Sequence, residues 1–254
     1  MRYSVTAYEL DTATQATIAA LESLNLQCYL VGSVACSAYG MSRTPNDIDM
    51  VVLHLDYTQE QLKDLLVQKD HRFYLIASKD PLATYRVLWF RLSGYRRSCK
   101  VDLLLPGIMN IPYWRYSLNV VLISSPSSTY SSADYPLMPF LSLLLLKLQA
   151  WQDHGESPKM FMQQKQPTDV QDIKELLQLA EQKYAIGDKI PHLPQSFIQA
   201  ANIRVRKFAR MHPWSKNQWR MIGFKVDSSA TIQSEGQSDV QRPERMMSSL
   251  VLNF

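Results

Sequence analysis

Two aspartates separated by one apolar residue, Asp47-Ile48-Asp49, carry the clearest chemical pattern in the sequence. Apolar residues continue from 50 to 53, which predicts a buried strand over 47–55. Because side chains alternate along a strand, both carboxylates are expected on one face and Ile48 on the other. Carboxylates are the oxygen ligands that Mg²⁺ takes together with substrate phosphates. The pair therefore predicts a divalent metal site, with surface acids in an Asx-rich turn as the alternative interpretation.

A small-residue turn, Gly32-Ser33, stands ahead of the acidic pair and follows a short apolar strand expected at 27–31. A short helix is expected to begin behind it, at about 34–39. Backbone N–H groups in such a turn and at a helix start favour anions. A phosphate site beside a metal site is what phosphoryl or nucleotidyl transfer requires.

A third carboxylate, Asp102, lies within an otherwise apolar run that predicts a strand over 99–105. If this strand is a neighbour of the acidic strand, Asp102 lies beside Asp47 and Asp49. A charge at the end of a strand is the alternative for Asp102 alone.

The order Gly32-Ser33, Tyr39, then Arg43-x-x-x-Asp47-x-Asp49 resembles the signature of the DNA polymerase β-type nucleotidyltransferase superfamily. The long spacing between turn and acids is similar to the AbiEii-type branch. Two later motifs add to the resemblance, Leu144-Leu145-Leu146-Lys147-Leu148-Gln149-Ala150 and Lys165-x-x-x-Asp169-x-x-Asp172. The resemblance spans about 28–180, and it departs from the family at Leu141-Ser142-Leu143, where an acid often precedes the lysine.

The resemblance implies an α+β fold, in which a small mixed β-sheet nucleotidyltransferase domain is followed by a helical C-terminal domain. The implied metal-binding and catalytic residues are Asp47, Asp49 and Asp102. The implied nucleotide-binding residues are Gly32, Ser33, Arg43, Lys147 and Asp169.

The expected reaction moves a nucleoside monophosphate from an NTP to an acceptor hydroxyl and releases pyrophosphate, with two Mg²⁺ ions as cofactors. The acceptor is left open among RNA, protein and a small molecule such as an aminoglycoside, and nothing selects ATP over the other NTPs. The alternative is a catalytically inactive nucleotide- or RNA-binding module, although three close carboxylates that repel one another have no purpose in an idle site.

Several individual residues also have an alternative interpretation, in which their role is structural. Lys147 stands in the most apolar helix and needs a partner, a phosphate or a route to water. Arg43 suits a triphosphate, but a structural ion pair with Asp47 or Asp49 competes with that role. Asp169 and Asp172 also suit an ordinary helix start. Basic residues with interleaved aromatics at 204–220 suit RNA, or the solvated face of an amphipathic helix.

The elements that must position these residues follow from periodicity and capping signals. Strands are expected at 27–31, 47–55, 73–77, 84–92, 99–105 and 119–124. Helices are expected at 11–25 with Asp11 as N-cap, at 58–69 with a capping box from Thr58, at 137–154, at 168–184 with a capping box from Thr168, at 194–211 and at 214–224.

The domain organisation follows from composition. A Ser-, Pro- and Tyr-rich segment, 124–136, predicts a boundary between a catalytic domain at 1–125 and a helical domain at 137–225 that closes the nucleotide cleft. A polar, loose tail is expected at 226–254.

The composition fits an ordinary globular enzyme. Of 254 residues, 46% are apolar and 20% charged, and the net charge of +4 is compatible with polyanionic substrates. Three unpaired cysteines favour a reducing compartment, and scattered histidines disfavour zinc. We expect a cytoplasmic location, because no secretory pattern is visible and the apolar run 137–146 is too short to span a membrane.

Overall fold

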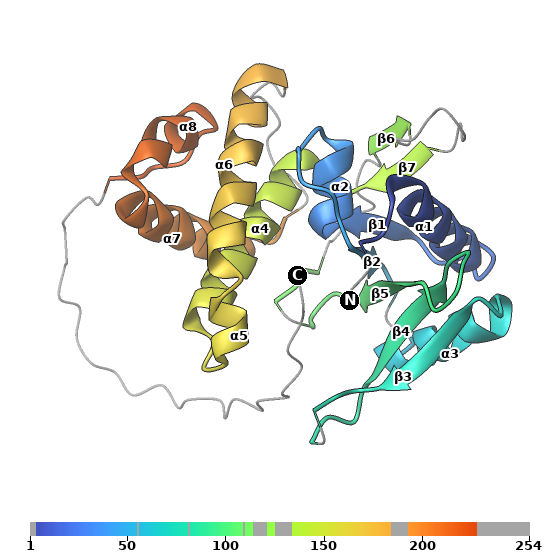
Figure 1. The fold of residues 1–254 in the computed structure, drawn as a ribbon. Helices are drawn as coiled ribbons and strands as arrows, with labels where there is room; N and C mark the ends of the chain where they lie inside the picture. Colours follow the sequence, from blue (N-terminus) through green and yellow to red (C-terminus); the bar gives the residue numbers. More distant parts are fainter. Residues whose placement is uncertain are drawn as a thin grey trace.

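The computed structural model describes residues 4–54, 56–80, 82–108, 110–113, 121–124, 134–183 and 193–227. Seven strands form one mixed sheet in the order β3-β4-β5-β2-β1-β7-β6 (Figure 1). Their bounds are Cys28–Val31 for β1, Asp47–Val52 for β2, Phe73–Ala77 for β3, Arg86–Arg91 for β4, Ser98–Leu104 for β5, Val121–Ser124 for β6 and Asp134–Leu137 for β7. The pairs β2–β5 and β1–β7 are parallel, and the other pairs are antiparallel. The expected α+β class is confirmed.

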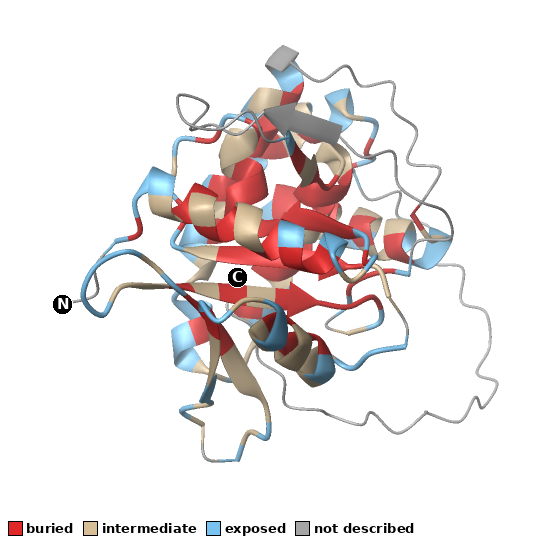
Figure 2. Ribbon diagram, turned by 90° about the vertical axis from the view of Figure 1, so that its right-hand side faces the viewer, coloured by how far each residue is buried: buried red, intermediate tan, exposed pale blue. Residues whose placement is uncertain are grey.

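The centre of the sheet is the most deeply buried part of the fold. All four residues of β1 are buried, and so are the last five residues of β2 (Figure 2). Towards the edge of the sheet fewer residues are buried: Phe73 in β3, and Leu88 and Phe90 in β4. The most deeply buried strands therefore lie in the middle of the sheet, and the strands towards its β3 edge are more exposed.

Helices cover the sheet and form a second layer beside it (Figure 1). The helix α1 (Ala7–Glu22) packs against β2 and β5, and α3 (Gln59–Lys69) packs against β3 and β5. The short helix α2 (Gly32–Ala38) contacts β1, β2 and the long helix α4 (Phe140–Glu156). The remaining helices are α5 (Met160–Gln163), α6 (Gln166–Lys183), α7 (Gln195–Met211), the 3₁₀ turn η1 (Pro213–Ser215) and α8 (Lys216–Met221). Because α4 contacts α2, α6 and α7, it joins the helical layer to the sheet.

Two predicted helix N-caps are wrong. The first helix begins at Ala7, where Thr6 and Glu9 form a capping box, and Asp11 is a buried residue inside the helix that accepts a hydrogen bond from the Tyr135 hydroxyl. The helix α6 begins at Gln166, so the expected capping box at Thr168 does not form. The capping box at Thr58 is confirmed, with Gln61 as its third helical residue.

The segment expected to be an irregular boundary contains a strand. β7 pairs with β1 at Leu30 and Leu137, and α4 begins only at Phe140 rather than at 137. Tyr135 and Leu137 are buried, which explains why this short strand is held in the sheet despite its proline. The chain therefore returns to the sheet directly before the helical layer. Most of the predicted tail, 228–254, lies outside the described residues.

In the described part of the chain, none of the helices has the length and apolar character that crossing a membrane requires.

Candidate functional site

The parallel pairing of β2 with β5 brings the acidic residues together. Asp49 is opposite Asp102 in the register, and Asp47 is opposite Lys100. Residues opposite each other in a ladder, and residues two apart along a strand, have side chains on the same face. These four side chains therefore share one face at the middle of the sheet, and we call them the acidic cluster.

Asp49 is the most constrained member of the acidic cluster. It is 2% exposed, and within the described residues its Oδ1 atom is buried without a hydrogen-bond partner. Burial raises the pKa of Asp49 well above its ordinary value, and the charges of Asp47 and Asp102 raise it further. A carboxylate held in this way favours the approach of a cation.

Gly32 closes one side of the acidic cluster. Its φ of +62° lies in the left-handed region, where glycine has no steric penalty. A Cβ atom on Gly32 would overlap the carboxylate of Asp49, so the close approach of this backbone to Asp49 requires glycine. The next residue, Ser33, is buried at the start of α2. The Gly-Ser turn thus lies directly against Asp49.

Lys100 supplies a positive charge inside the acidic cluster. Its Nζ atom donates a hydrogen bond to Oδ2 of Asp102, and both side chains are largely buried. Burial raises the pKa of Asp102, while the Lys100 ammonium opposes that shift. One of the three carboxylates is therefore already paired with a cation from the chain.

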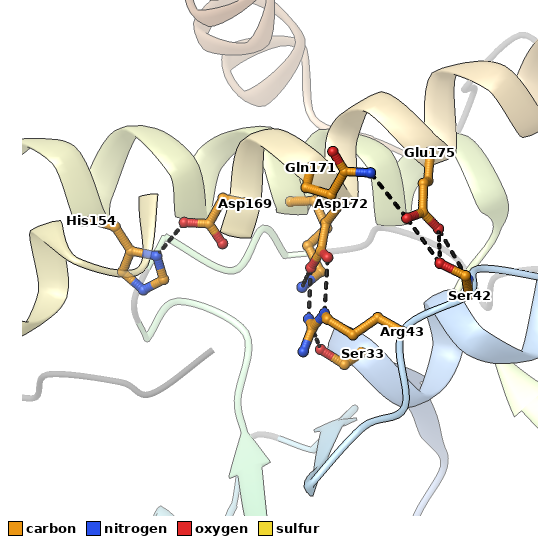
Figure 3. Close-up of polar contacts among 9 residues, drawn as sticks. Ser33, Ser42, Arg43, His154, Asp169, Gln171, Asp172 and Glu175 are labelled. Carbon is orange, nitrogen blue, oxygen red and sulfur yellow. Dashed lines mark hydrogen bonds and ion pairs between the residues drawn. The ribbon is translucent and has the colours of Figure 1, made fainter. Parts of the chain in front are cut away.

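A second charged group lies where α6 meets the loop after α2 (Figure 3). Arg43 donates from Nε to Oδ1 of Asp172 at 3.0 Å and from Nη2 to Oδ2 at 2.7 Å. Lys147 of α4 donates to the same Oδ2 at 2.9 Å. Nη2 of Arg43 also donates to Oγ of Ser33 at 2.5 Å. Arg43 is therefore ion-paired with Asp172, rather than with Asp47 or Asp49 as the structural alternative supposed.

Asp169 does not pair with Arg43 but with a histidine. Its Oδ2 atom lies 2.6 Å from Nδ1 of His154, and both side chains are buried (Figure 3). The pair links α6 to α4. Of the sequence-derived residues, the structure thus brings Gly32, Ser33 and the three acids together, joins Arg43 and Lys147 through Asp172, and holds Asp169 against a histidine.

Three lysine and aspartate residues at the site were not among the predicted site residues. Lys100 precedes Asp102 by two positions, so strand alternation alone places it on the same face. Asp172 belongs to the later motif, whose positions the resemblance places near the nucleotide, but Asp169 alone represents that motif among the predicted nucleotide-binding residues. Burial and the charge of Lys100 lower the pKa of Lys165, whereas Asp47 opposes that effect, so Lys165 also lies close to the acidic cluster.

The acidic cluster is not a ready-made coordination shell. Considering only the described parts of the chain, no group of three or more His, Cys, Asp or Glu side chains has an arrangement suited to hold a metal ion. The donors are hard oxygens, but Lys100 occupies one side of the cluster. A divalent ion would therefore have to bind next to this ammonium or displace it.

Comparison with known proteins gives a match in structure alone. No family model matches the sequence, and no curated protein matches it. The crystal structure of an antigenic nucleotidyltransferase-like protein from Paracoccidioides brasiliensis has a TM-score of 0.62 and 17% identity, covering 91% of this chain and 99% of that one.

Two further structures are much less similar. ANT(2")-Ia, in complex with adenylyl-2"-tobramycin, has a TM-score of 0.36 and 10% identity over 67% of this chain and 94% of that one. Terminal uridylyl transferase 4 from Trypanosoma brucei, with bound GTP, has a TM-score of 0.33 and 14% identity over 84% of this chain and 68% of that one. These two scores are too low to carry an argument. The likeness to the first structure shows that the chain has a nucleotidyltransferase fold.

Proposed function

We propose that this chain is a Mg²⁺-dependent nucleotidyltransferase, which moves a nucleoside monophosphate from an NTP to an acceptor hydroxyl and releases pyrophosphate. One observation carries the proposal: the β2–β5 register sets Asp49 beside Asp102 and next to the Gly-Ser turn, and among the described residues the buried Oδ1 atom of Asp49 finds no hydrogen-bond partner. Without a cation, this arrangement is costly, because burial and mutual repulsion both act against the ionised acids.

The donor chemistry of the acidic cluster fits magnesium, although its present arrangement, with Lys100 on one side, is not yet a coordination shell. Asp47, Asp49 and Asp102 offer hard oxygen donors, and in the described part of the chain Oδ1 of Asp49 is buried without a hydrogen-bond partner. When bound, two Mg²⁺ ions would neutralise phosphate charge and hold the reacting oxygens in line. Asp102, on the neighbouring strand, would accept the proton from the acceptor hydroxyl.

The remaining residues would bind and orient the triphosphate. Gly32 and Ser33 would lie against its terminal phosphates. Arg43 is 36% exposed and can meet the charge that develops on pyrophosphate, whereas Lys147 is 3% exposed. Lys147 would thus act through Asp172 by fixing the position of Arg43. Asp169, which the resemblance assigns to nucleotide binding, would act together with His154 to hold α6 against α4.

We further infer an AbiEii-like branch and a two-part organisation. The pairing of Arg43 with Asp172 joins the first motif of that branch to its last one, and Lys147 joins the helix motif to both. In this proposal, residues 1–125 supply the catalytic sheet and residues 137–225 cover the nucleotide. The NTP base and the acceptor, RNA included, are left to experiment.

The test is transfer of label from each α-³²P-labelled NTP, with Mg²⁺ and either total RNA or cell extract as the source of acceptor. Asp49→Asn removes one charge of the acidic cluster, and Asp56→Asn is the matched control, because Asp56 lies on an exposed loop after β2. We expect label on one acceptor class with the wild type and Asp56→Asn, and none with Asp49→Asn. Full transfer by Asp49→Asn would overturn the proposal.

A second candidate function is a nucleotide- or RNA-binding module without turnover. The observation that favours it is the ion pair of Lys100 with Asp102, because an ammonium can stabilise the acids without any metal. The two candidates differ in a binding measurement. The affinity for an NTP rises with Mg²⁺ in a nucleotidyltransferase, and it is independent of Mg²⁺ in a module whose acids are neutralised by lysine.

A further inference from the structure

Lys100 has an environment that an ordinary surface lysine does not have. Its side chain is 16% exposed, it lies opposite Asp47 in the ladder, and its Nζ atom is hydrogen-bonded to Asp102. Burial opposes the charge of Lys100, but the attraction of Asp102, Asp49 and Asp47 outweighs it, so the pKa of the ammonium is raised. The lysine is therefore a cation fixed within the acidic cluster.

The ammonium leaves the cluster incompletely neutralised. Three carboxylates share the face with Lys100, and the ammonium donates a hydrogen bond to Asp102. Within the described residues, Oδ1 of the almost fully buried Asp49 has no partner at all. A buried carboxylate oxygen without a partner is costly, and its position beside Asp47 points to a further cation. The cluster is thus built for one external cation at Asp49 and an internal one at Asp102.

We propose that Lys100 competes with a divalent cation for Asp102, so that the free protein holds one divalent ion, at Asp47 and Asp49. A second ion can reach Asp102 only when Lys100 leaves it, and the phosphates of a bound NTP offer the ammonium a new partner. Lys100 is then a positioning residue that couples the second metal ion to the nucleotide. This inference rests on the proposed function for the identity of the nucleotide, whereas the competition itself is independent of turnover.

The experiment is a titration of the whole protein with Mn²⁺, followed by calorimetry and by the electron paramagnetic resonance signal of free Mn²⁺. Lys100→Met keeps the length of the side chain and removes its charge. We expect this variant to bind a second Mn²⁺, or to bind Mn²⁺ about tenfold or more tightly, because one nearby like charge has been removed. Lys100→Arg restores the charge and should behave as the wild type does.

The matched control is Lys159→Met, which removes a charge from a lysine whose partner is Asp80, at 3.5 Å. An equal gain in this control would mean that net charge alone explains the effect and would overturn the proposal. Unchanged affinity and stoichiometry in Lys100→Met would overturn it as well.

A second measurement needs no variant. The wild type should bind one Mn²⁺ alone and two in the presence of a non-hydrolysable NTP analogue, and two ions in the absence of nucleotide would refute the competition. A protein that binds Mn²⁺ in this pattern but shows no turnover would contradict the proposed function alone. If the wild type turns over and its Mn²⁺ titration is identical to that of Lys100→Met, the role of Lys100 alone would be contradicted.

Discussion

Replacement of Asp172 by asparagine tests whether the Arg43–Asp172–Lys147 group holds the helical layer to the sheet. Asp172 is 1% exposed and Lys147 is 3% exposed, and their ion-pair atoms are 2.9 Å apart. At that distance and an effective dielectric constant near 20, two unit charges attract by roughly 6 kcal/mol before desolvation is counted. Removing one partner from a buried pair typically costs about 3–5 kcal/mol.

The expected loss for Asp172→Asn is near the lower end of that range, about 3 kcal/mol in the free energy of unfolding. Arg43 is 36% exposed, so water screens its charge once the carboxylate is gone, and the asparagine carbonyl still accepts one hydrogen bond. The larger part of the loss comes from Lys147, which is left charged and buried on α4 without its carboxylate.

The assay is equilibrium unfolding in urea, followed by tryptophan fluorescence, with the slope m checked for each variant. The matched control is Glu175→Gln, one turn further along α6. Glu175 accepts hydrogen bonds from Ser42 at a more exposed position, so we expect a loss below about 1 kcal/mol. A Lys147→Met change should recover most of the stability of Asp172→Asn. A loss below about 1 kcal/mol for Asp172→Asn, or no recovery in the double variant, would refute the reasoning.

Three further changes have defined outcomes. Gly32→Ala should destabilise the fold by about 2–4 kcal/mol in urea unfolding and abolish turnover, because a Cβ overlaps Asp49 at a φ of +62°. The control for backbone strain alone is Gly223→Ala, since Gly223 has a φ of +90° but open space around its Cβ position, and it should cost less. A loss within about 1 kcal/mol for Gly32→Ala would contradict this. Asp49→Asn should stabilise the metal-free protein by about 1–2 kcal/mol at pH 7, because it removes a buried, repelled charge; destabilisation in a thermal scan would count against it. The Arg97 guanidinium lowers the pKa of Glu9 from 4.5 to about 2. The stabilisation by Glu9 is therefore full above pH 4.5 and is lost as the pH falls towards 2, so Glu9→Gln should differ from wild type by about 1 kcal/mol at pH 7 and converge with it at pH 2; a constant difference would refute the linkage.

The sequence predicts the acidic part of the site well because local alternation determines it. The pattern of Asp47-Ile48-Asp49 predicts a strand with both acids on one face, and β2 begins at Asp47. The pairing with the strand of Asp102 was a conditional expectation, and the register of β2 with β5 confirms that the two strands are neighbours. The same alternation places Lys100 on the face of Asp102, so its presence in the site could be predicted from the sequence as well.

The charged group around Asp172 depends on packing that no local pattern specifies. Arg43 and Asp172 are 129 positions apart, and their contact requires α6 to lie over α4 and the loop after α2. The strand β7 is similar, because Asp134-Tyr135-Pro136-Leu137 is short and contains a proline. Its place in the sheet follows from the buried side chains of Tyr135 and Leu137, which contact partners far away in the chain. Capping signals failed at Asp11 because a second capping pattern, Thr6 with Glu9, begins the helix earlier.

Catalysis of nucleotidyl transfer by the acidic cluster is tested most directly by pyrophosphate release. The release is measured for each NTP in the presence of Mg²⁺, with cell extract as the source of the acceptor. The wild type and Asp56→Asn should release pyrophosphate from at least one NTP, and both Asp49→Asn and Asp102→Asn should lower the rate by a factor of about 100 or more. Equal rates in all four proteins, or no release by any of them, would contradict the assignment of these carboxylates to catalysis.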